Sequence, residues 1–532
     1  MNLSLKKLRP AHYMGGICVI LGLTAFYAIA LKSVFSVSEN ADWHSFLKDS
    51  YLHHVIFFSV LQAFLSAWLS IIIGVFFART LFYLEFVGKS LVLKLLSLTY
   101  VLPSLVAVFG IIGIYGNAGW IANITARLNI DWQPNIYGLS GILVANLFFN
   151  IPLATKIFLQ SLCSIPNQQR QLAAQLGIRG WQFIRLIELP YLRQQLLSLF
   201  ALVFMLCFTG FTIVLTLGGG PQYTTLEVAI YQAIVFEFNL SKAALFALLQ
   251  FLFCFVIFST MSSFSKNHIA EINQKKLWKA SQSSAVKILQ LFILLTILLF
   301  LLTPLLNIIV AGFNLHLIFQ SLQNPQLWRA LGYSITIAPI SACTALIFSI
   351  ALLLLSRRLQ WLNYNNVANA ILNAGMVILA IPTLVLAMGL FICLQHIDFT
   401  PIHLFGIVVL CNALAAMPFV LRILHTPMNN NMQYYEKLCQ SLGIKGIARW
   451  YWVERHTLSH PLKYAFAIAC ALSLGDFTAI ALFGTQDFTS LPHLLYSQLG
   501  SYRNQEGAVT ALLLLIFCSL IFIFAEHHHD KT

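Results

Sequence analysis

Long runs of apolar residues, separated by short polar stretches, make up most of this chain. A helix needs about 20 apolar residues to cross the hydrocarbon core of a bilayer. Twelve runs reach that length, near residues 14–34, 55–78, 91–115, 137–158, 196–216, 243–263, 285–311, 331–356, 370–394, 404–424, 462–484 and 508–525. The pattern therefore predicts an all-α polytopic membrane protein with about 12 transmembrane helices.

The basic residues predict how these helices are oriented. Lys and Arg in short loops resist translocation, so they collect on the cytoplasmic side. If both termini are cytoplasmic, six of the 31 Lys and Arg residues fall outside, which leaves 31 − 6 = 25 inside. The six are Lys32, Lys48, Arg127, Lys242, Arg329 and Arg503. The formal net charge of +14 is therefore mostly a consequence of topology, and binding of nucleic acid, which needs a soluble basic face, is not expected.

Composition excludes a soluble domain. Apolar residues make up 59% of the 532 residues, charged residues make up 9%, and the mean hydropathy is +0.81. The ten cysteines show neither the spacing of a disulfide framework nor that of a metal site. We expect no metal and no cofactor bound to the chain itself.

The second half of the chain repeats the first. A shift of 443 − 177 = 266 residues aligns several positions, and upstream the shift becomes 382 − 103 = 279. The aligned pairs include Asn146 with Asn412, Pro152 with Pro418, Gly177 with Gly443, Glu188 with Glu454, Phe211 with Phe477 and Pro103 with Pro382. Six helices per half give both halves the same orientation, so we expect parallel repeats over residues 1–270 and 271–532, with a pathway between them.

One polar segment is copied between the fourth and fifth predicted helices of each half, in loops at about 159–195 and 425–461. The copies read QRQLAAQLGIRGWQFIRLIELP and EKLCQSLGIKGIARWYWVERH. Leu172 and Leu176 share one helical face, and Gly177 can take the left-handed conformation that ends a helix. We expect a second short helix to follow and to stop at Pro190. An amphipathic hairpin lying on lipid is the alternative, but its duplication favours a docking element for a twofold partner.

The segment resembles the coupling-loop motif of ABC-importer permeases, Glu-Ala-Ala-x3-Gly-x9-Ile-x-Leu-Pro. Ala173, Gly177, Ile187, Leu189 and Pro190 match the motif. The departures are Gln171 and Leu172 in place of Glu-Ala, Lys437 at the Glu position of the second copy, and Arg455 and His456 in place of its Leu-Pro. These last two suggest a looser second hinge. The resemblance implies an ATPase-coupling role for Gln171, Leu172, Ala173, Leu176, Gly177, Glu188, Leu189, Pro190, Lys437, Leu438, Leu442, Gly443 and Glu454.

Further stretches widen the resemblance. QRQLAAQLG, LTLGGGPQYTTLEVAIYQA, SLGDF and GSYRNQEGA are similar to the fused twelve-helix thiamine permeases of Gram-negative bacteria, from about Asp42 to the last span. Fused ferric-iron permeases share the repeat and the first motif and remain an alternative. The resemblance implies an inner-membrane permease for thiamine or its phosphates. Its partners would be cytoplasmic ATPase subunits, expected as a homodimer, and a periplasmic substrate-binding protein.

The chain offers no catalytic site of its own. VGKS at 87–90 looks like the end of a phosphate-binding loop, but Tyr83 stands where the first glycine should be. We therefore expect ATP to be hydrolysed by a separate subunit. A secondary transporter is the alternative class, but it should carry several ionisable groups within the membrane. A membrane receptor or scaffold without transport is a further alternative.

Asp476 is the clearest ionisable residue within a predicted span, where burial in lipid costs about 2.5–3.5 kcal/mol. It aligns with Gly210 and therefore breaks the repeat symmetry. A carboxylate beside aromatic rings would suit the thiazolium cation of thiamine. The alternative is an Asp that fixes helix packing by hydrogen bonds. We also expect Pro103 and Pro382 to kink or unwind the third and ninth predicted helices.

Overall fold

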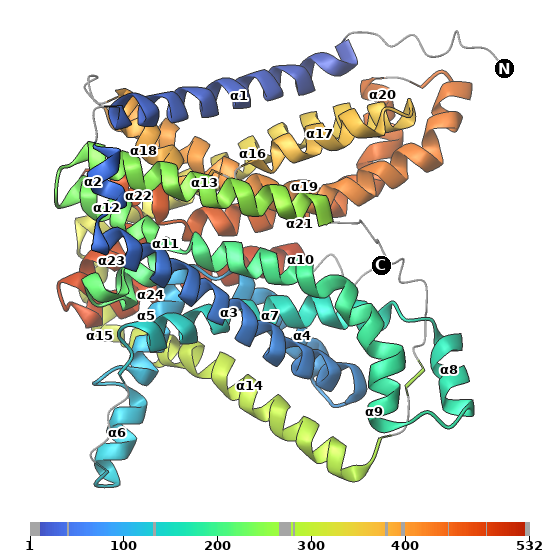
Figure 1. The fold of residues 1–532 in the computed structure, drawn as a ribbon, viewed down its shortest axis with the longest axis horizontal. Helices are drawn as coiled ribbons and strands as arrows, with labels where there is room; N and C mark the ends of the chain where they lie inside the picture. The colour runs from blue at the N-terminus through green and yellow to red at the C-terminus, as the bar shows by residue number, and fades with distance from the viewer. Residues whose placement is uncertain are drawn as a thin grey trace.

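The protein is a bundle of long helices, as seen in a computed structural model (Figure 1). The structure describes residues 11–39, 42–130, 135–264, 278–279, 282–377, 381–394, 400–444, 446–485 and 487–526. These residues form helices and loops, and no strand occurs among them. Within this part of the chain, eleven helical stretches are long and apolar enough to cross a membrane. The predicted all-α membrane fold is confirmed.

The helices of the first half are α1 (Ala11–Ser38), α2 (Trp43–Leu47), α3 (Ser50–Tyr83), α4 (Lys89–Val101), α5 (Ser104–Tyr115), α6 (Trp120–Arg127), α7 (Leu139–Cys163), α8 (Asn167–Gln175), α9 (Gly180–Phe183), the π-helix η2 (Ile184–Glu188), α10 (Leu189–Phe208), α11 (Phe211–Leu217), the 3₁₀-helix η3 (Pro221–Tyr223), α12 (Leu226–Val235) and α13 (Leu240–Phe264).

The helices of the second half are α14 (Ser284–Gly312), α15 (Leu315–Leu322), α16 (Pro325–Trp361), α17 (Asn365–Gly375), α18 (Thr383–Leu394), α19 (Pro401–Ser441), α20 (Ile447–Arg449), the π-helix η5 (Trp450–Glu454), α21 (Arg455–Gly475), α22 (Thr478–Phe483), α23 (Leu491–Gly500) and α24 (Asn504–Glu526).

The bundle has two different ends. Figure 1 shows α8, α9 and α20 at one end, here called the hairpin end, and α2, α12, α15 and α23 at the other, here called the outer end. The long helices run between these ends. The copied polar segments of the two halves therefore lie on the same side of the bundle, as parallel repeats require.

Prolines interrupt the third and ninth predicted spans, as expected. Pro103 separates α4 from α5, and Leu102 before it has extended backbone with ψ 141°. A proline lacks the N–H that a helix needs, and its ring forces the preceding residue out of the helical region. Pro382 directly precedes α18, and α17 and α18 together replace the single span predicted at 370–394.

Two further predicted spans, at 196–216 and 462–484, also contain an interruption of the helix, although Trp450–Phe483 is still long and apolar enough to cross a membrane. The first breaks between α10 and α11 at Gly210, and the second between α21 and α22 at Asp476. Asp476 takes extended backbone, and its carboxylate accepts a hydrogen bond of 2.9 Å from the N–H of Thr478. The side chain thus supplies the acceptor that the first turn of α22 would otherwise lack.

The two halves interlock through their first helices. α1 packs mainly on α16 and α18 of the second half, while α14 packs on α5 of the first half. Gly389 on α18 and Gly110 on α5 occupy equivalent repeat positions, since 389 − 110 = 279. A Cβ at either glycine would collide with the backbone of the incoming helix, at Ala30 or Pro304. Glycine is therefore what lets each half hold the first helix of the other.

Candidate functional site

A cavity of about 280 Å³ lies where three helix interruptions meet. Its walls come from both halves: the α4–α5 junction, α7 and the α10–α11 junction from the first, and α19 and the α21–α22 junction from the second. The volume is close to the lower limit of about 300 Å³ for ligand pockets. Irregular backbone at membrane depth is tolerated where it lines such a cavity.

Asp476 lines this cavity and keeps one of its two carboxylate oxygens unpaired. Oδ1 accepts from Thr478, whereas the buried Oδ2 has no hydrogen-bond partner among the described residues. By contrast, Asn146 on α7 donates to Gln62 on α3 at 3.1 Å, and Asn150 on α7 donates to Sγ of Cys207 on α10 at 3.3 Å. A buried polar atom without a partner is costly and calls for an explanation. The two asparagines thus hold helices together, while Asp476 leaves one carboxylate oxygen without a partner among the described residues.

Phe211 and Phe477 form one wall of the cavity. These repeat-equivalent residues stack on each other across the boundary between the halves, with ring centroids 5.9 Å apart and ring planes 11° from parallel. The cavity therefore presents both a carboxylate and aromatic rings.

The first copied segment forms the predicted hairpin at the hairpin end. α8 ends at Gln175, and Gly177 follows with φ +73°, so the expected left-handed glycine is confirmed. Gln171, Leu172 and Leu176 are exposed, whereas Ala173 is buried. The exposed pair of leucines leaves an apolar surface open on this hairpin.

The second copy has the same turn on a different support. Gly443 has φ +67°, and Lys437, Leu438 and Leu442 are exposed. The expected short first helix is not separate here, because α19 runs for 41 residues through Ser441. Pro166 precedes α8 in the first copy, but Met432 stands at the equivalent place, since 432 − 166 = 266. Without that proline the transmembrane helix continues directly into the hairpin.

Pro190 does not end the second helix of the hairpin, so that prediction is wrong. The chain passes from α9 through the π-helix η2 directly into α10, with Leu189 and Pro190 exposed in its first turn. Proline is tolerated at the start of an α-helix, and the preceding π-turn changes the hydrogen-bond register there. The π-helix recurs as η5 before Arg455 and His456. The backbone therefore gives no sign of the looser second hinge that the sequence suggests.

Glu188 does not face out from the hairpin but is fully buried, with 0% exposed. It accepts a hydrogen bond of 2.7 Å from Nε of Arg79 at the end of α3, and a second one from the hydroxyl of Tyr83. Arg170 on α8 lies nearby, with its guanidinium 4.4 Å from the ring centroid of Phe82. Burial lowers the pKa of Arg170, and the charges of Tyr83 and Glu188 oppose this shift. A buried charge cluster thus fastens the first hairpin to α3.

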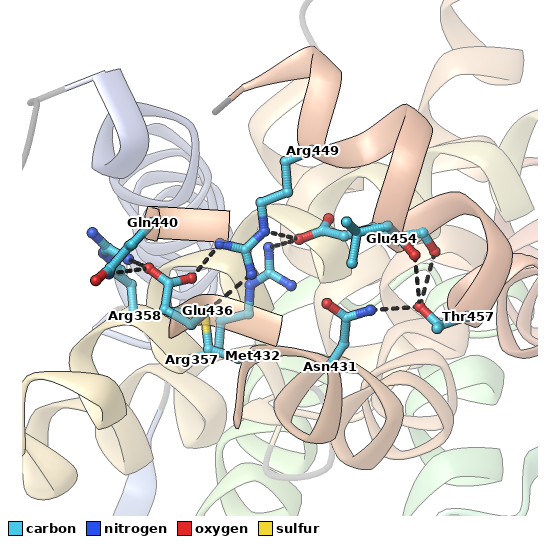
Figure 2. Close-up of polar contacts among 10 residues, drawn as sticks. Arg357, Arg358, Asn431, Met432, Glu436, Gln440, Arg449, Glu454 and Thr457 are labelled. Carbon is cyan, nitrogen blue, oxygen red and sulfur yellow. Dashed lines mark hydrogen bonds and ion pairs between the residues drawn. The ribbon is translucent and has the colours of Figure 1, made fainter. Parts of the chain in front are cut away.

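The second half builds a larger cluster at the equivalent place, shown in Figure 2. Glu454 accepts from Arg357 at 2.7 Å and from Nε of Arg449 at 2.9 Å. Arg449 also pairs with Glu436, which accepts from Arg358 at 2.5 Å. Burial lowers the pKa of Arg449, but the bonds and charges of Glu436 and Glu454 outweigh it and leave this pKa raised. Arg449 therefore joins both arms of the hairpin, and the two glutamates connect them to the end of α16.

The two clusters have equivalent residues at two positions, but a third position carries opposite charges in the two halves. Arg79 and Arg358 are equivalent at the shift of 358 − 79 = 279, and Glu188 and Glu454 at 454 − 188 = 266. Arg170 of the first cluster, however, corresponds to Glu436 of the second. At the level of sequence, these arginines predicted only the orientation of the helices. The repeat shift pairs Arg79 with Arg358 and could have marked them as equivalent structural residues.

Trp278 and Lys279, which lie between α13 and α14, contact the first half beside its hairpin. The N–H of Trp278 donates to Oδ1 of Asn167 at 2.9 Å, and Lys279 pairs with Glu85. The hydrogen bond from Lys279 lowers the pKa of Glu85. Trp278 thus rests against the start of α8.

The clusters predict a stability difference between buried and exposed glutamates. Glu454→Gln leaves Arg357 and Arg449 buried without their common carboxylate, and losing one partner of a buried pair costs about 3–5 kcal/mol. Glu237→Gln is the matched control, because Glu237 pairs with Lys242 at the surface and such pairs contribute about 0–1 kcal/mol. Thermal denaturation of the purified proteins measures both. Equal denaturation midpoints for the two variants would contradict a structural role for the cluster.

Comparison with known proteins agrees with this geometry. Residues 70–270 match the family described as binding-protein-dependent transport system inner membrane component. The thiamine transport system permease protein ThiP of Haemophilus influenzae is 59% identical over 524 residues, which cover 98% of this chain and 97% of that protein. ThiP of Escherichia coli is 44% identical and covers 94% of each chain. ThiP of Brucella abortus is 36% identical over 90% of this chain and 88% of its own.

A more distant relative covers less of the chain. The sulfate transport system permease protein CysW of Synechococcus elongatus is 26% identical over 195 residues, or 36% of this chain and 66% of its own. The long matches, together with the paired hairpins and the cavity between two interlocked halves, decide the assignment. The chain belongs to the family of thiamine transport system permeases, the multi-pass inner-membrane components of binding-protein-dependent ABC importers.

Proposed function

We propose that this chain carries thiamine, or one of its phosphates, from the periplasm to the cytoplasm as the permease of an ATP-driven importer. The observation that carries the proposal is the cavity between the two halves, which Asp476 lines with an unpartnered carboxylate oxygen. The names of the relatives supply the substrate.

The chemistry of the cavity fits a cationic substrate. An ionised group within a membrane costs about 2.5–3.5 kcal/mol and usually marks a substrate or ion pathway. Asp476 can offset the positive charge of a thiazolium ring, and the faces of Phe211 and Phe477 attract a cation through their quadrupoles. The helix interruption at Asp476 leaves room for backbone movement as the substrate passes.

The two hairpins are the proposed docking sites for a dimeric cytoplasmic ATPase. Their exposed leucines, Leu172 and Leu176 in one and Leu438 and Leu442 in the other, form matched apolar surfaces at one end of the bundle. Glu188 and Glu454 do not contact the partner in this proposal; they transmit its movement to α3 and α16 through the arginines with which they pair. The permease itself hydrolyses no ATP and needs no cofactor. A periplasmic binding protein delivers substrate to the outer end.

Reconstitution tests the transport function directly. The chain is placed in proteoliposomes with its co-encoded ATPase and binding protein, and uptake of labelled thiamine and of ferric iron is measured with and without ATP. ATP-dependent accumulation of thiamine is the expected result. Accumulation of iron but not thiamine would replace this proposal with the ferric-iron alternative, and uptake of thiamine that needs no ATPase would indicate a secondary transporter.

Asp476→Asn tests the role of the carboxylate. The amide keeps the size and can still accept the hydrogen bond from Thr478, so only the charge is removed. A charged contact contributes roughly 1.5–3 kcal/mol, so uptake should fall by about tenfold or more. Asp487→Asn, at an exposed aspartate of the outer end, is the matched control and should leave uptake unchanged. Normal uptake by Asp476→Asn would assign this residue to helix packing.

Gly177→Val tests the first docking hairpin. The position has φ +73° and open space where a Cβ would stand, so the strain of about 1–3 kcal/mol comes from the backbone alone. We expect normal insertion but weaker co-purification of the ATPase and weaker substrate-stimulated hydrolysis. Gly177→Asn is the control, because Asn tolerates the left-handed region.

Gly443→Val should be as damaging as Gly177→Val, since both turns have the same geometry. The second copy has Arg455 and His456 where the first has Leu189 and Pro190, and a helix stop at Pro190 would have made the second turn less constrained. Pro190 lies in the first turn of α10 and ends no helix, so this reason for a milder effect does not apply. Full ATPase binding and transport by Gly177→Val would refute the docking role.

We propose that both termini and the hairpin end are cytoplasmic, on the basis of the Lys and Arg asymmetry. Reporter fusions at Lys89, Arg185, Lys275, Arg357 and Arg449 should report the cytoplasm, and those at Asp42, Arg127, Thr225, Asn314 and Asp487 the periplasm. Lys275 lies outside the described residues. A strong periplasmic signal from the fusion at Arg185 or Arg449 would invert the orientation.

A further inference from the structure

Four aromatic rings form a continuous row across the boundary between the halves. Tyr231 contacts Phe211 at a centroid distance of 5.2 Å, Phe211 stacks on Phe477 at 5.9 Å, and Phe477 contacts Tyr496 at 4.9 Å. The row is nearly symmetric in the repeat, because 477 − 211 = 266 and 496 − 231 = 265. Its centre is therefore the contact between the two phenylalanines.

The row lies between the cavity and the outer end. Phe211 and Phe477 line the cavity, whereas Tyr231 and Tyr496 behind them belong to α12 and α23, which Figure 1 shows at the outer end. The two phenylalanines are only 2% and 1% exposed, so they leave no open passage between them. The stacked pair closes the cavity on this side.

The backbone allows the two central rings to separate. Phe211 is the first residue of α11, directly after the interruption at Gly210, and Phe477 lies within the interruption between α21 and α22. Residues in an interruption can change their backbone angles without breaking a run of helical hydrogen bonds. Either ring can therefore move while the long helices α10 and α21 stay intact.

Carboxylates lie beside the row in both halves. Asp476 directly precedes Phe477, and Glu227 lies one helical turn before Tyr231 on α12. Glu227 is 1% exposed; Oε1 accepts from Gln250 at 2.7 Å, while Oε2 has no partner among the described residues. Glu227 and Asp476 are close enough to interact electrostatically. Two buried carboxyl groups, one from each half, therefore flank the row of rings.

We propose that the Phe211–Phe477 pair is the outer closure of the transport path and that a flat aromatic cation crosses it by inserting its ring between the two phenyl rings. This inference rests on the proposed function and deepens it by naming the substrate feature that is recognised. The two ring planes are nearly parallel, so a third ring between them keeps both faces covered. The carboxylate of Asp476 stands beside the inserted ring, where it can balance the positive charge.

The ring pair selects among substrates by whether the substrate can replace the contact that the two rings lose when they separate. A ligand shifts a conformational equilibrium only by its differential affinity for the two states. A flat aromatic cation regains stacking and cation–π attraction in the open state. A compact hydrated ion or an aliphatic cation regains neither stacked face, so it opens the pair less readily. The closure is thereby a specificity element for the substrate.

Ring replacement in the reconstituted importer tests the proposal. Phe211→Leu and Phe477→Leu keep apolar bulk but remove the ring, and they should lower thiamine uptake by about tenfold, the loss expected for stacking and cation–π contacts together. Phe211→Tyr and Phe477→Tyr keep the ring and should transport at nearly the rate of the unaltered protein. Phe208→Leu is the matched control: Phe208 is also 1% exposed and stacks on Phe204 at 5.8 Å, but it does not line the cavity.

The outcomes separate this inference from the function on which it rests. Failure of the unaltered complex to take up thiamine would defeat the proposed function itself. Normal uptake by both Leu variants, an equal fall in the Tyr variants, or an equal fall in Phe208→Leu would each overturn the ring closure alone. Co-purification of the ATPase measures assembly; where a Leu variant fails to assemble, the corresponding Met variant, which is also ringless but more adaptable, is judged by the same criteria.

Discussion

The hydrocarbon core of a membrane offers no water to an unpaired backbone group, and this constraint organises the whole protein. Each backbone N–H and C=O must find a partner within the chain, so spanning segments are helical, and interruptions are tolerated only where they are buried in protein or line a cavity. The breaks at Pro103, Gly210 and Asp476 obey this rule, because all three converge on the same cavity. Three interruptions of the helices therefore meet at one cavity between the halves.

Buried glutamates that pair with arginines hold the hairpins in place at the hairpin end. Each hairpin is fixed by the glutamate that ends its π-helix and by an arginine from the end of a long helix of the same half. Burying such an ion pair costs desolvation free energy, so the pair contributes as much by fixing the geometry as by adding stability. Each hairpin is thus joined to α3 or α16, a helix that reaches toward the outer end.

Interlocking of the halves adds a mechanical consequence. Because α1 packs on the second half and α14 on the first, neither half can rotate without carrying a helix of the other along. The close approaches at Gly110 and Gly389 make these contacts tight. The Phe211–Phe477 contact lies at the boundary between the same two halves. A relative movement of the halves would therefore change the distance between the two rings.

Features that depend on neighbouring residues along the chain could be predicted from the sequence, whereas contacts between distant residues became visible only in the folded protein. The length and apolarity of the runs predicted a bundle of membrane helices, and the repeat shift predicted equivalent left-handed turns at Gly177 and Gly443. Both properties depend on neighbouring residues alone. A membrane span requires a run of about 20 apolar residues, and a positive φ favours glycine wherever it occurs. Glu188 and Glu454, by contrast, were expected in ATPase coupling, yet they are buried and pair with arginines about 100 residues away, since 188 − 79 = 109 and 454 − 357 = 97. The break at Asp476 escaped the hydropathy pattern, because a carboxylate that caps a new helix leaves the apolar run around it intact, and such contacts depend on three-dimensional distance, which a run of apolar residues does not encode.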